Sequence, residues 1–269
     1  MDVVPGFSLT NRMLLYTSFL LAPAQFTSGL GNYCPSNFGF LAYNWYTQIH
    51  LLRATQGKEL RALSLVIPHI CVTFNFGYLG GISSGSTVIG TLQGILTAGL
   101  MLVNAAVMWI SWRVNQPDGF GTYEFFFFGW RTLTPDWHTF FLVWGIFDTF
   151  AAVGLAVGAI FGGYQIASNY EDNGQSAWKK WLGTIKTIFV GAASAMLALW
   201  PLVLWIELIV GRNHVESETD WIAVWLFVAQ VVTMTAPPLC SKWSQDNSET
   251  DLARLHASLD SSLSFGGTR

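Results

Sequence analysis

Three residues inside the apolar stretches of this chain can exchange protons. Asp148 is the one acidic residue in HTFFLVWGIFDTFAAVGLAVGAIFGGY, residues 138–164, and Glu207 lies in LALWPLVLWIELIV. His69 lies in VIPHICVTFNFGY, a segment that also contains Asn75. A carboxylic acid can act as a general acid, and an imidazole can exchange a proton near neutral pH. Asp148, Glu207 and His69 are therefore the candidate catalytic residues.

Aromatic residues accompany these acids at helical spacing. At about 100° per residue, Phe141, Trp144 and Asp148 share one helix face. Gly154, Gly158 and Gly162 recur every four residues, a pattern that favours close approach of another helix. Structural roles compete with these interpretations: an Asp can join helices, a lone His is often a satisfied core group, and aromatic residues often only pack. The candidate substrate-binding residues are Phe141, Trp144, Phe147, Trp200, Trp205 and Asn75.

The composition predicts that helices position these residues inside a membrane. The chain has 269 residues, of which 52% are hydrophobic and 11% are charged, whereas soluble domains carry roughly 25% charged residues. A helix that crosses a bilayer needs about 20 mostly apolar residues. We expect an all-α, polytopic membrane helix bundle of about seven transmembrane helices, at residues 11–29, 36–54, 61–79, 86–112, 138–164, 177–211 and 220–236. The segment at residues 36–54 is the weakest of these predicted spans, and its alternative position is in the membrane interface.

The bundle is expected to occupy residues 1–240, and residues 241–269 to form a polar, disordered tail. Basic residues favour a cytoplasmic N-terminus, because Arg12, Arg53 and Arg113 fall on one side of a seven-span arrangement. We expect a multi-pass protein of the endoplasmic reticulum or another endomembrane, in contact with membrane lipid. The net charge of −3 gives no indication of a nucleic-acid partner.

Motifs for several functions are missing from the sequence. The five histidines form no closely spaced pairs, and the chain has no aspartate-rich diphosphate motif, Walker loop or TVGYG filter. We therefore expect neither a metal nor a cofactor. Cys34, Cys71 and Cys240 have no CxxC spacing. Cys34 and Cys240 fall on the same side of the predicted membrane, so a disulfide between them and free thiols are both open.

Two function classes fit this set of residues. One is an enzyme acting on a lipophilic small molecule, with a buried acid as proton donor and aromatic faces that stabilise positive charge. The other is a small-molecule or proton-coupled transporter, in which Asp148 and His69 carry the coupling proton. The excess of aromatic over ionisable residues favours the enzyme, because a transport path needs more polar lining.

The segments WGIFDTF and LWIELIV, in a Trp- and Phe-rich chain of this length, resemble the integral-membrane terpene cyclases of fungal meroterpenoid biosynthesis. The resemblance covers architecture and composition. It implies an enzyme, classed as an isomerase or lyase of secondary metabolism, that protonates a prenylated substrate and starts carbocation cyclisation without metal. It also implies that Asp148 is the general acid, with Glu207 or His69 as the group that returns or orients the proton.

Overall fold

The computed structural model describes residues 2–28, 37–67, 69, 87–168 and 177–235, and this part of the chain is mostly helical. The all-α prediction is confirmed, with the addition of one short hairpin. The helices are α1 (Leu9–Ser28), α2 (Asn37–Gln56), α4 (Thr87–Ile110), α5 (Pro135–Ser168), α6 (Ala177–Arg212) and α7 (Trp221–Thr235). Residues 63–67 and 69 are also helical. Between α4 and α5 lie η3 (Ser111–Asn115), η4 (Pro117–Gly119), β1 (Glu124–Phe126) and β2 (Trp130–Thr132).

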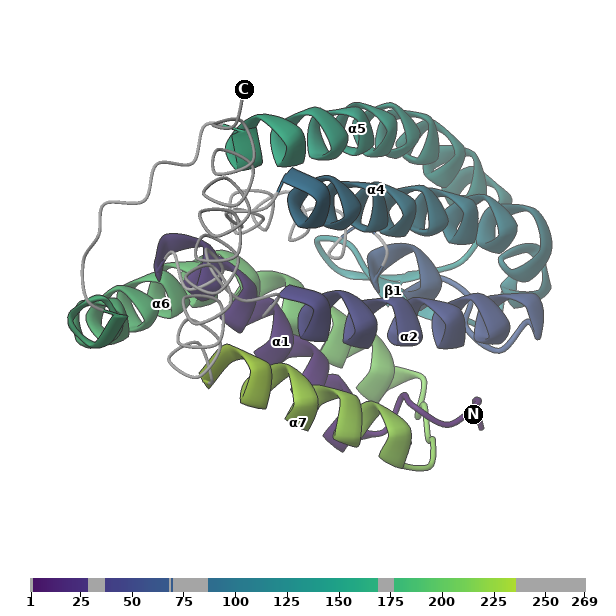
Figure 1. Cartoon of the computed structure of the whole chain (residues 1–269). Coiled ribbons are helices and arrows are strands. Elements are labelled where there is room, and N and C mark those ends of the chain that lie inside the picture. The colour runs from purple at the N-terminus through teal and green to yellow at the C-terminus, as the bar shows by residue number, and fades with distance from the viewer. Residues whose placement is uncertain (1, 29–36, 68, 70–86, 169–176, 236–269) are drawn as a thin grey trace, which may run out of the picture.

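The helices pack in two groups that α2 joins. α4 and α5 run side by side and make the most extensive helix contact in the described chain (Figure 1). α1 packs on α6, and α7 packs chiefly on α2. α2 also contacts α4, so it lies between the two groups. Asn44 and Gln48 on α2 are buried, so this part of the helix faces other helices.

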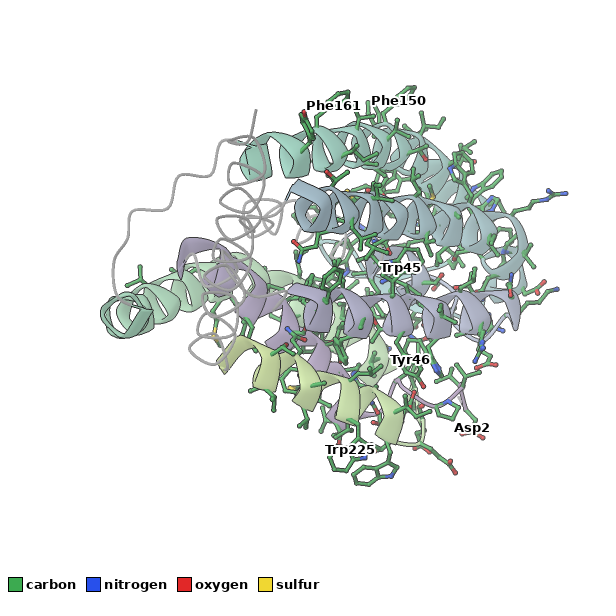
Figure 2. All side chains as sticks on the ribbon, viewed as in Figure 1. Asp2, Trp45, Tyr46, Phe150, Phe161 and Trp225 are labelled. Atoms are coloured by element: carbon green, nitrogen blue, oxygen red, sulfur yellow. The ribbon has the colours of Figure 1, made fainter. Side chains whose placement is uncertain are left out.

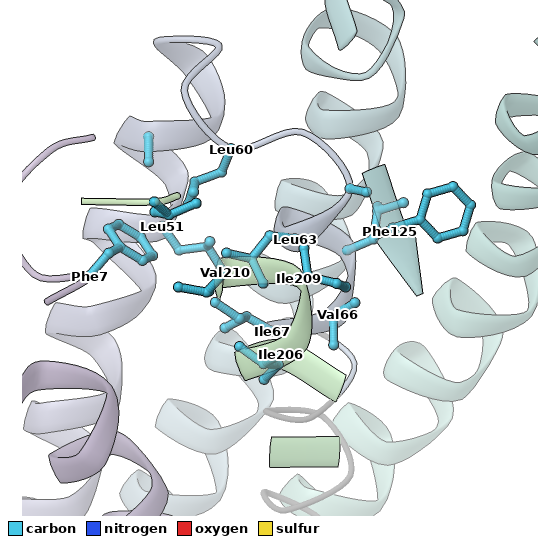
Figure 3. Close-up of a cluster of buried hydrophobic side chains, with 14 of the residues drawn as sticks. Phe7, Leu51, Leu60, Leu63, Val66, Ile67, Phe125, Ile206, Ile209 and Val210 are labelled. Carbon is cyan, nitrogen blue, oxygen red and sulfur yellow. The ribbon is translucent and has the colours of Figure 1, made fainter. Parts of the chain in front are cut away.

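The main hydrophobic core gathers residues from distant parts of the chain. It joins the N-terminal segment, the end of α2, the helical residues 63–67, the hairpin and the end of α6 (Figure 3). Leu51, Leu60, Leu63, Ile206 and Ile209 are each at most 1% exposed. Burial of an aliphatic side chain contributes about 1.5–3 kcal/mol. This core holds the helical residues 63–67 against α6 and the hairpin, and His69 follows two residues later.

The glycine stripe of α5 does not serve as a packing face among the described residues. A Cβ added at Gly154, Gly158 or Gly162 would meet no described atom within 4 Å. Close packing instead occurs at Gly94 of α4, where an added Cβ would lie 2.6 Å from the carbonyl oxygen of Ala159. Gly154 and Gly158 are exposed, so among the described residues no helix packs on this stripe.

Large apolar side chains cover the outside of the bundle. Phe150 and Phe161 on α5 and Trp225 on α7 point away from it on opposite sides (Figure 2) and are 75%, 64% and 69% exposed. By length and composition, two helices among the described residues, Gly90–Asn115 and Pro135–Gly162, are long and apolar enough to cross a membrane. Trp221–Thr233 is a shorter apolar helix. The three cysteines, Asn75 and the predicted tail lie outside the described residues.

Candidate functional site

Asp148 lies on the buried face of α5. Its neighbours on this face recur every three or four residues, which keeps them on one side of the helix. Asp148 itself is 6% exposed. The buried residues of this face are Phe141, Gly145, Asp148, Ala152, Ala156 and Ala159. The sequence thus directs one carboxyl group into the bundle while the opposite side of α5 stays apolar and exposed.

Asp148 is joined to His69. The Nδ1 atom of His69 lies 3.1 Å from Oδ1 of Asp148. The Asp148 side chain is 4% exposed, whereas that of His69 is 35% exposed. The ring of Trp144 meets the imidazole edge-on, with 5.4 Å between ring centroids. Asp148 therefore contacts the imidazole from the buried side, and His69 is the more exposed member of the pair.

His69 opens onto an aromatic pocket. The pocket has about 330 Å³ of empty space, including space open to the outside. Asp148 does not line it and reaches it only through His69. The lining residues are Leu65, Val66, His69, Phe127, Phe140, Phe141, Trp144 and Trp205. An imidazole among five aromatic rings can exchange a proton in surroundings that favour an apolar ligand and stabilise positive charge.

The β-hairpin forms one wall of this pocket. β1 and β2 pair antiparallel, and Phe127 follows β1. The indole N–H of Trp205 on α6 donates to the carbonyl oxygen of Phe126. The ring of Phe127 packs against Trp137 and Phe140, at centroid distances of 5.3 Å and 5.4 Å. The next residue, Phe128, is 93% exposed. The two rings meet edge-on, with 5.1 Å between centroids, so Phe127 lies at the pocket and Phe128 packs on it from the outside.

Polar contacts fix the base of the hairpin to the end of α6. Arg212 forms an ion pair with Glu124, and its guanidinium lies over the ring of Trp130, 5.3 Å from the centroid. The side chain of Asn213 both accepts from the backbone N–H of Glu124, at 3.1 Å, and donates to its carbonyl oxygen, at 2.6 Å. The hydrogen bond from Arg212 to Glu124 raises the pKa of Arg212. Burial raises the pKa of Tyr123 beside this base, so its phenol stays neutral.

Glu207 lies in a different network from Asp148. Arg12 donates two hydrogen bonds to it, from Nε at 2.8 Å and from Nη2 at 3.0 Å. The hydroxyl of Tyr16 donates a third, at 2.7 Å. The three candidate catalytic residues thus form one pair, His69 with Asp148, and one separate carboxylate. Glu207 points toward α1 because a buried arginine there needs a counter-charge.

Only some of the candidate substrate-binding residues lie at the pocket beside His69. Phe141, Trp144 and Trp205 line the pocket with His69. Phe147 is 72% exposed and Trp200 is 54% exposed, and neither lines it. Phe147 directly precedes Asp148, so it lies about 100° around the helix from the buried carboxyl group. Asn75 lies outside the described residues.

Sequence reasoning missed a second His–Asp pair. His50 Nε2 lies 3.3 Å from Oδ2 of Asp220, and the hydroxyl of Tyr46 donates to the same oxygen at 2.7 Å. Asp220 directly precedes an apolar helix, which is a signal for a helix cap and not for a partner on α2. Among the described residues, no group of three or more His, Cys, Asp or Glu side chains is placed to hold a metal ion.

The pocket around His69 and Phe127 also depends on the hairpin, whose partners are far away in sequence. The aromatic residues at 121–140 predict a segment that lies in the membrane interface or caps a cavity, and a plain aromatic belt is the favoured interpretation. Gly129, with φ of 150°, is a local signal for a turn. No family model, curated protein or solved structure matches the chain.

Proposed function

We propose that the chain is a membrane-embedded enzyme that opens an epoxide on a lipophilic, prenylated substrate and so starts its cyclisation, without metal. The observation that carries the proposal is His69, held by Asp148 at 3.1 Å and facing a pocket with five aromatic side chains. The polar pair supplies a proton, and the apolar walls accept the prenyl chain. The fungal membrane terpene cyclases, which the chain resembles, use the same kind of chemistry.

In this proposal His69 touches the substrate, and Asp148 is a positioning residue. The imidazolium donates its proton to the epoxide oxygen while the C–O bond breaks, and the electron pair of that bond stays on oxygen. The π electrons of a neighbouring alkene form the new C–C bond. The final carbocation loses a proton to the neutral imidazole, so the reaction is an isomerisation that needs no oxidant or reductant.

An epoxide suits this site better than an unactivated alkene. An imidazolium is a mild acid, and proton transfer to an epoxide oxygen needs a weaker acid than proton transfer to an alkene carbon. The faces of Trp144, Phe140 and Phe127 can stabilise the developing positive charge, a contact worth about 0.5–2 kcal/mol for each ring that faces a cation. Phe141 and Trp205 complete the wall.

The same proposal includes a seven-span arrangement in an endomembrane, with a cytoplasmic N-terminus. The two long apolar helices and the exposed aromatic face of α5 support membrane insertion. The basic residues Arg12, Arg53 and Arg113 support the orientation. An apolar substrate that dissolves in the bilayer would reach the pocket from the lipid side.

Proton-coupled transport is a second candidate function, and buried polar groups on α4 favour it. Gln93, Thr97 and Asn104 are at most 2% exposed. Within the part of the chain that the structure describes, Oε1 of Gln93, Oγ1 of Thr97 and both amide atoms of Asn104 have no hydrogen-bond partner. Buried polar atoms without partners are expensive, and in membrane helices they often mark a solute path.

The deciding experiment uses membranes that contain the expressed protein. They receive the terminal epoxide of a farnesylated phenol, and products are separated by chromatography and identified by mass spectrometry. We expect a cyclised isomer of unchanged mass, lost in His69→Gln and present with Phe147→Leu, which alters only an exposed side chain. If no offered epoxide gives an isomer, the enzyme proposal fails. Proton-dependent uptake into vesicles would then support the transporter.

A further inference from the structure

A second pocket lies at the other His–Asp pair. The N-terminal segment, α1, α2 and the start of α7 enclose it, and it has about 550 Å³ of empty space, including space open to the outside. Ile67 lines this pocket, whereas Leu65, Val66 and His69 line the first, so the helical residues 63–67 lie between the two. The residues that line this pocket include Gly6, Phe7, Arg12, Tyr16, Tyr43, Tyr46, His50 and Asp220.

Asp220 fixes the orientation of the His50 ring. Its Oδ1 accepts the backbone N–H groups of Ile222 and Ala223, at 2.9 Å and 3.4 Å, and so caps α7. Its Oδ2 accepts from Tyr46 at 2.7 Å and faces His50 Nε2 at 3.3 Å. A carboxylate can only accept, so this contact favours a neutral His50 ring with its proton on Nε2. In the neutral ring, Nδ1 is then left as an acceptor.

That acceptor is an unusual feature of the pocket. His50 Nδ1 is buried and has no hydrogen-bond partner in the described part of the chain. A buried polar atom without a partner generally destabilises a protein, so such atoms often mark a binding function. Gly6 lies beside it: a Cβ at Gly6 would be 3.7 Å from Nδ1, and its φ of +112° disfavours other residues.

The charges of the pocket favour a cation. Arg12 is neutralised by its two hydrogen bonds to Glu207. With His50 neutral, Asp220 then leaves one formal negative charge on the lining. Phe7, Tyr16, Tyr43 and Tyr46 add aromatic surface, which attracts cations through the ring quadrupole.

We propose that this pocket binds a primary ammonium group. Such a group donates an N–H to His50 Nδ1, balances the charge of Asp220 and contacts the aromatic rings. A quaternary ammonium has the charge but no N–H and leaves Nδ1 without a partner. A free alkylamine and the headgroup of phosphatidylethanolamine both supply this chemistry. The proposal goes beyond the epoxide-opening function and does not depend on it.

The test compares two probes on the purified protein. Thermal unfolding is followed by tryptophan fluorescence with butylammonium or butyltrimethylammonium. We expect butylammonium to raise the midpoint by a few degrees and butyltrimethylammonium to have little effect, because only a ligand of the folded state shifts it. The shift should disappear in His50→Phe. It should persist in His69→Phe, the matched change at the other His–Asp pair.

A second experiment, with lipid, distinguishes a free amine from the headgroup of phosphatidylethanolamine as the source of the ammonium group. The protein is reconstituted in nanodiscs of mixed phosphatidylethanolamine and phosphatidylcholine, and retained lipid is identified by native mass spectrometry. Enrichment of phosphatidylethanolamine that His50→Phe abolishes identifies the headgroup, and a butylammonium shift without enrichment identifies a free amine. Equal shifts with both probes, or no shift and no enrichment, overturn the proposal. If His50→Phe does not fold, the difference between the two probes on the unaltered protein still decides.

Discussion

Arg12 of α1 donates two hydrogen bonds to Glu207 of α6, at 2.8 Å and 3.0 Å, across 195 residues of sequence. The Arg12 side chain is 10% exposed and that of Glu207 is 26% exposed. Two hydrogen bonds in parallel fix the relative orientation of the two helices as well as their charges. The pair is therefore a structural connection between α1 and α6.

We expect Glu207→Ala to destabilise the fold. It leaves the guanidinium of Arg12 without its counter-charge, and breaking a mostly buried pair costs about 3–5 kcal/mol, or somewhat less here because Glu207 is partly exposed. The matched control is Asp118→Ala, which breaks the exposed pair with Lys58 and should cost at most about 1 kcal/mol. Unfolding in mixed micelles with increasing denaturing detergent measures both. Equal effects of the two substitutions would contradict a structural role for Glu207.

Asp148→Asn should reduce epoxide opening strongly while the protein still folds and inserts. The amide keeps the size of the carboxyl group but no longer balances an imidazolium at His69. We expect turnover to fall by about 10²- to 10⁴-fold, the usual contribution of general acid–base catalysis, with KM nearly unchanged because Asp148 does not line the pocket. Initial rates over a range of substrate concentrations measure both quantities. Full activity in the variant would leave Asp148 as a structural link between helices.

Trp144→Phe should have a smaller effect on turnover than Trp144→Leu. The ring of Trp144 meets His69 edge-on and lines the pocket, and phenylalanine keeps an aromatic face where leucine keeps only apolar volume. A cation–π contact is worth about 0.5–2 kcal/mol, so we expect roughly a 3- to 30-fold difference in turnover between the two variants. Product analysis under saturating epoxide measures it. Equal turnover would show that the ring contributes packing alone.

Gly94→Ala should destabilise the contact between α4 and α5. The new Cβ would lie 2.6 Å from the carbonyl oxygen of Ala159, closer than real Cβ contacts allow, so the helices must separate. Gly158→Ala is the matched control, because no described atom lies within 4 Å of its added Cβ. Alanine is favoured over glycine in a helix by about 0.5–1 kcal/mol, so Gly158→Ala should be neutral or stabilising. Thermal unfolding should therefore show a lower midpoint for Gly94→Ala and an unchanged or higher midpoint for Gly158→Ala; equal midpoints for the two variants would contradict the close contact at Gly94.

The topology prediction is tested by reporter fusions at the two ends of the chain. Seven spans place the N-terminus in the cytoplasm and the C-terminus on the opposite side. We expect a reporter that is glycosylated only in the lumen to be modified at the C-terminal fusion and unmodified at the N-terminal one. Modification at both ends, or at neither, requires an even number of spans.

Most helices could be predicted from the sequence because long apolar runs end at clear signals. The predicted segment 177–211 corresponds to α6, Ala177–Arg212, and 220–236 to α7, Trp221–Thr235. The segment 138–164 is longer in the structure, since α5 begins at Pro135, a residue type favoured at the first position of a helix. The hairpin was missed because each strand has only three residues, and because Asn213, which anchors Glu124, is 89 residues away in sequence.

The candidate site could be predicted only where residues share one helix. Phe141, Trp144 and Asp148 follow from helical periodicity, but the meeting of His69 with Asp148 depends on how two helices pack. Glu207 lies in an apolar run just as Asp148 does, and composition does not distinguish a carboxylate paired with Arg12 from one paired with a histidine. The sequence therefore identified residues able to exchange protons but not their partners.

Phe127 and Phe128 are separated by a single peptide bond, yet one ring forms a wall of the pocket and the other is 93% exposed. Phe128 also adopts a left-handed backbone with φ of 48°, a conformation that bulky residues rarely adopt. The two rings also meet edge-on, with 5.1 Å between centroids, so a group that packs against Phe128 is separated from the pocket by a single aromatic ring.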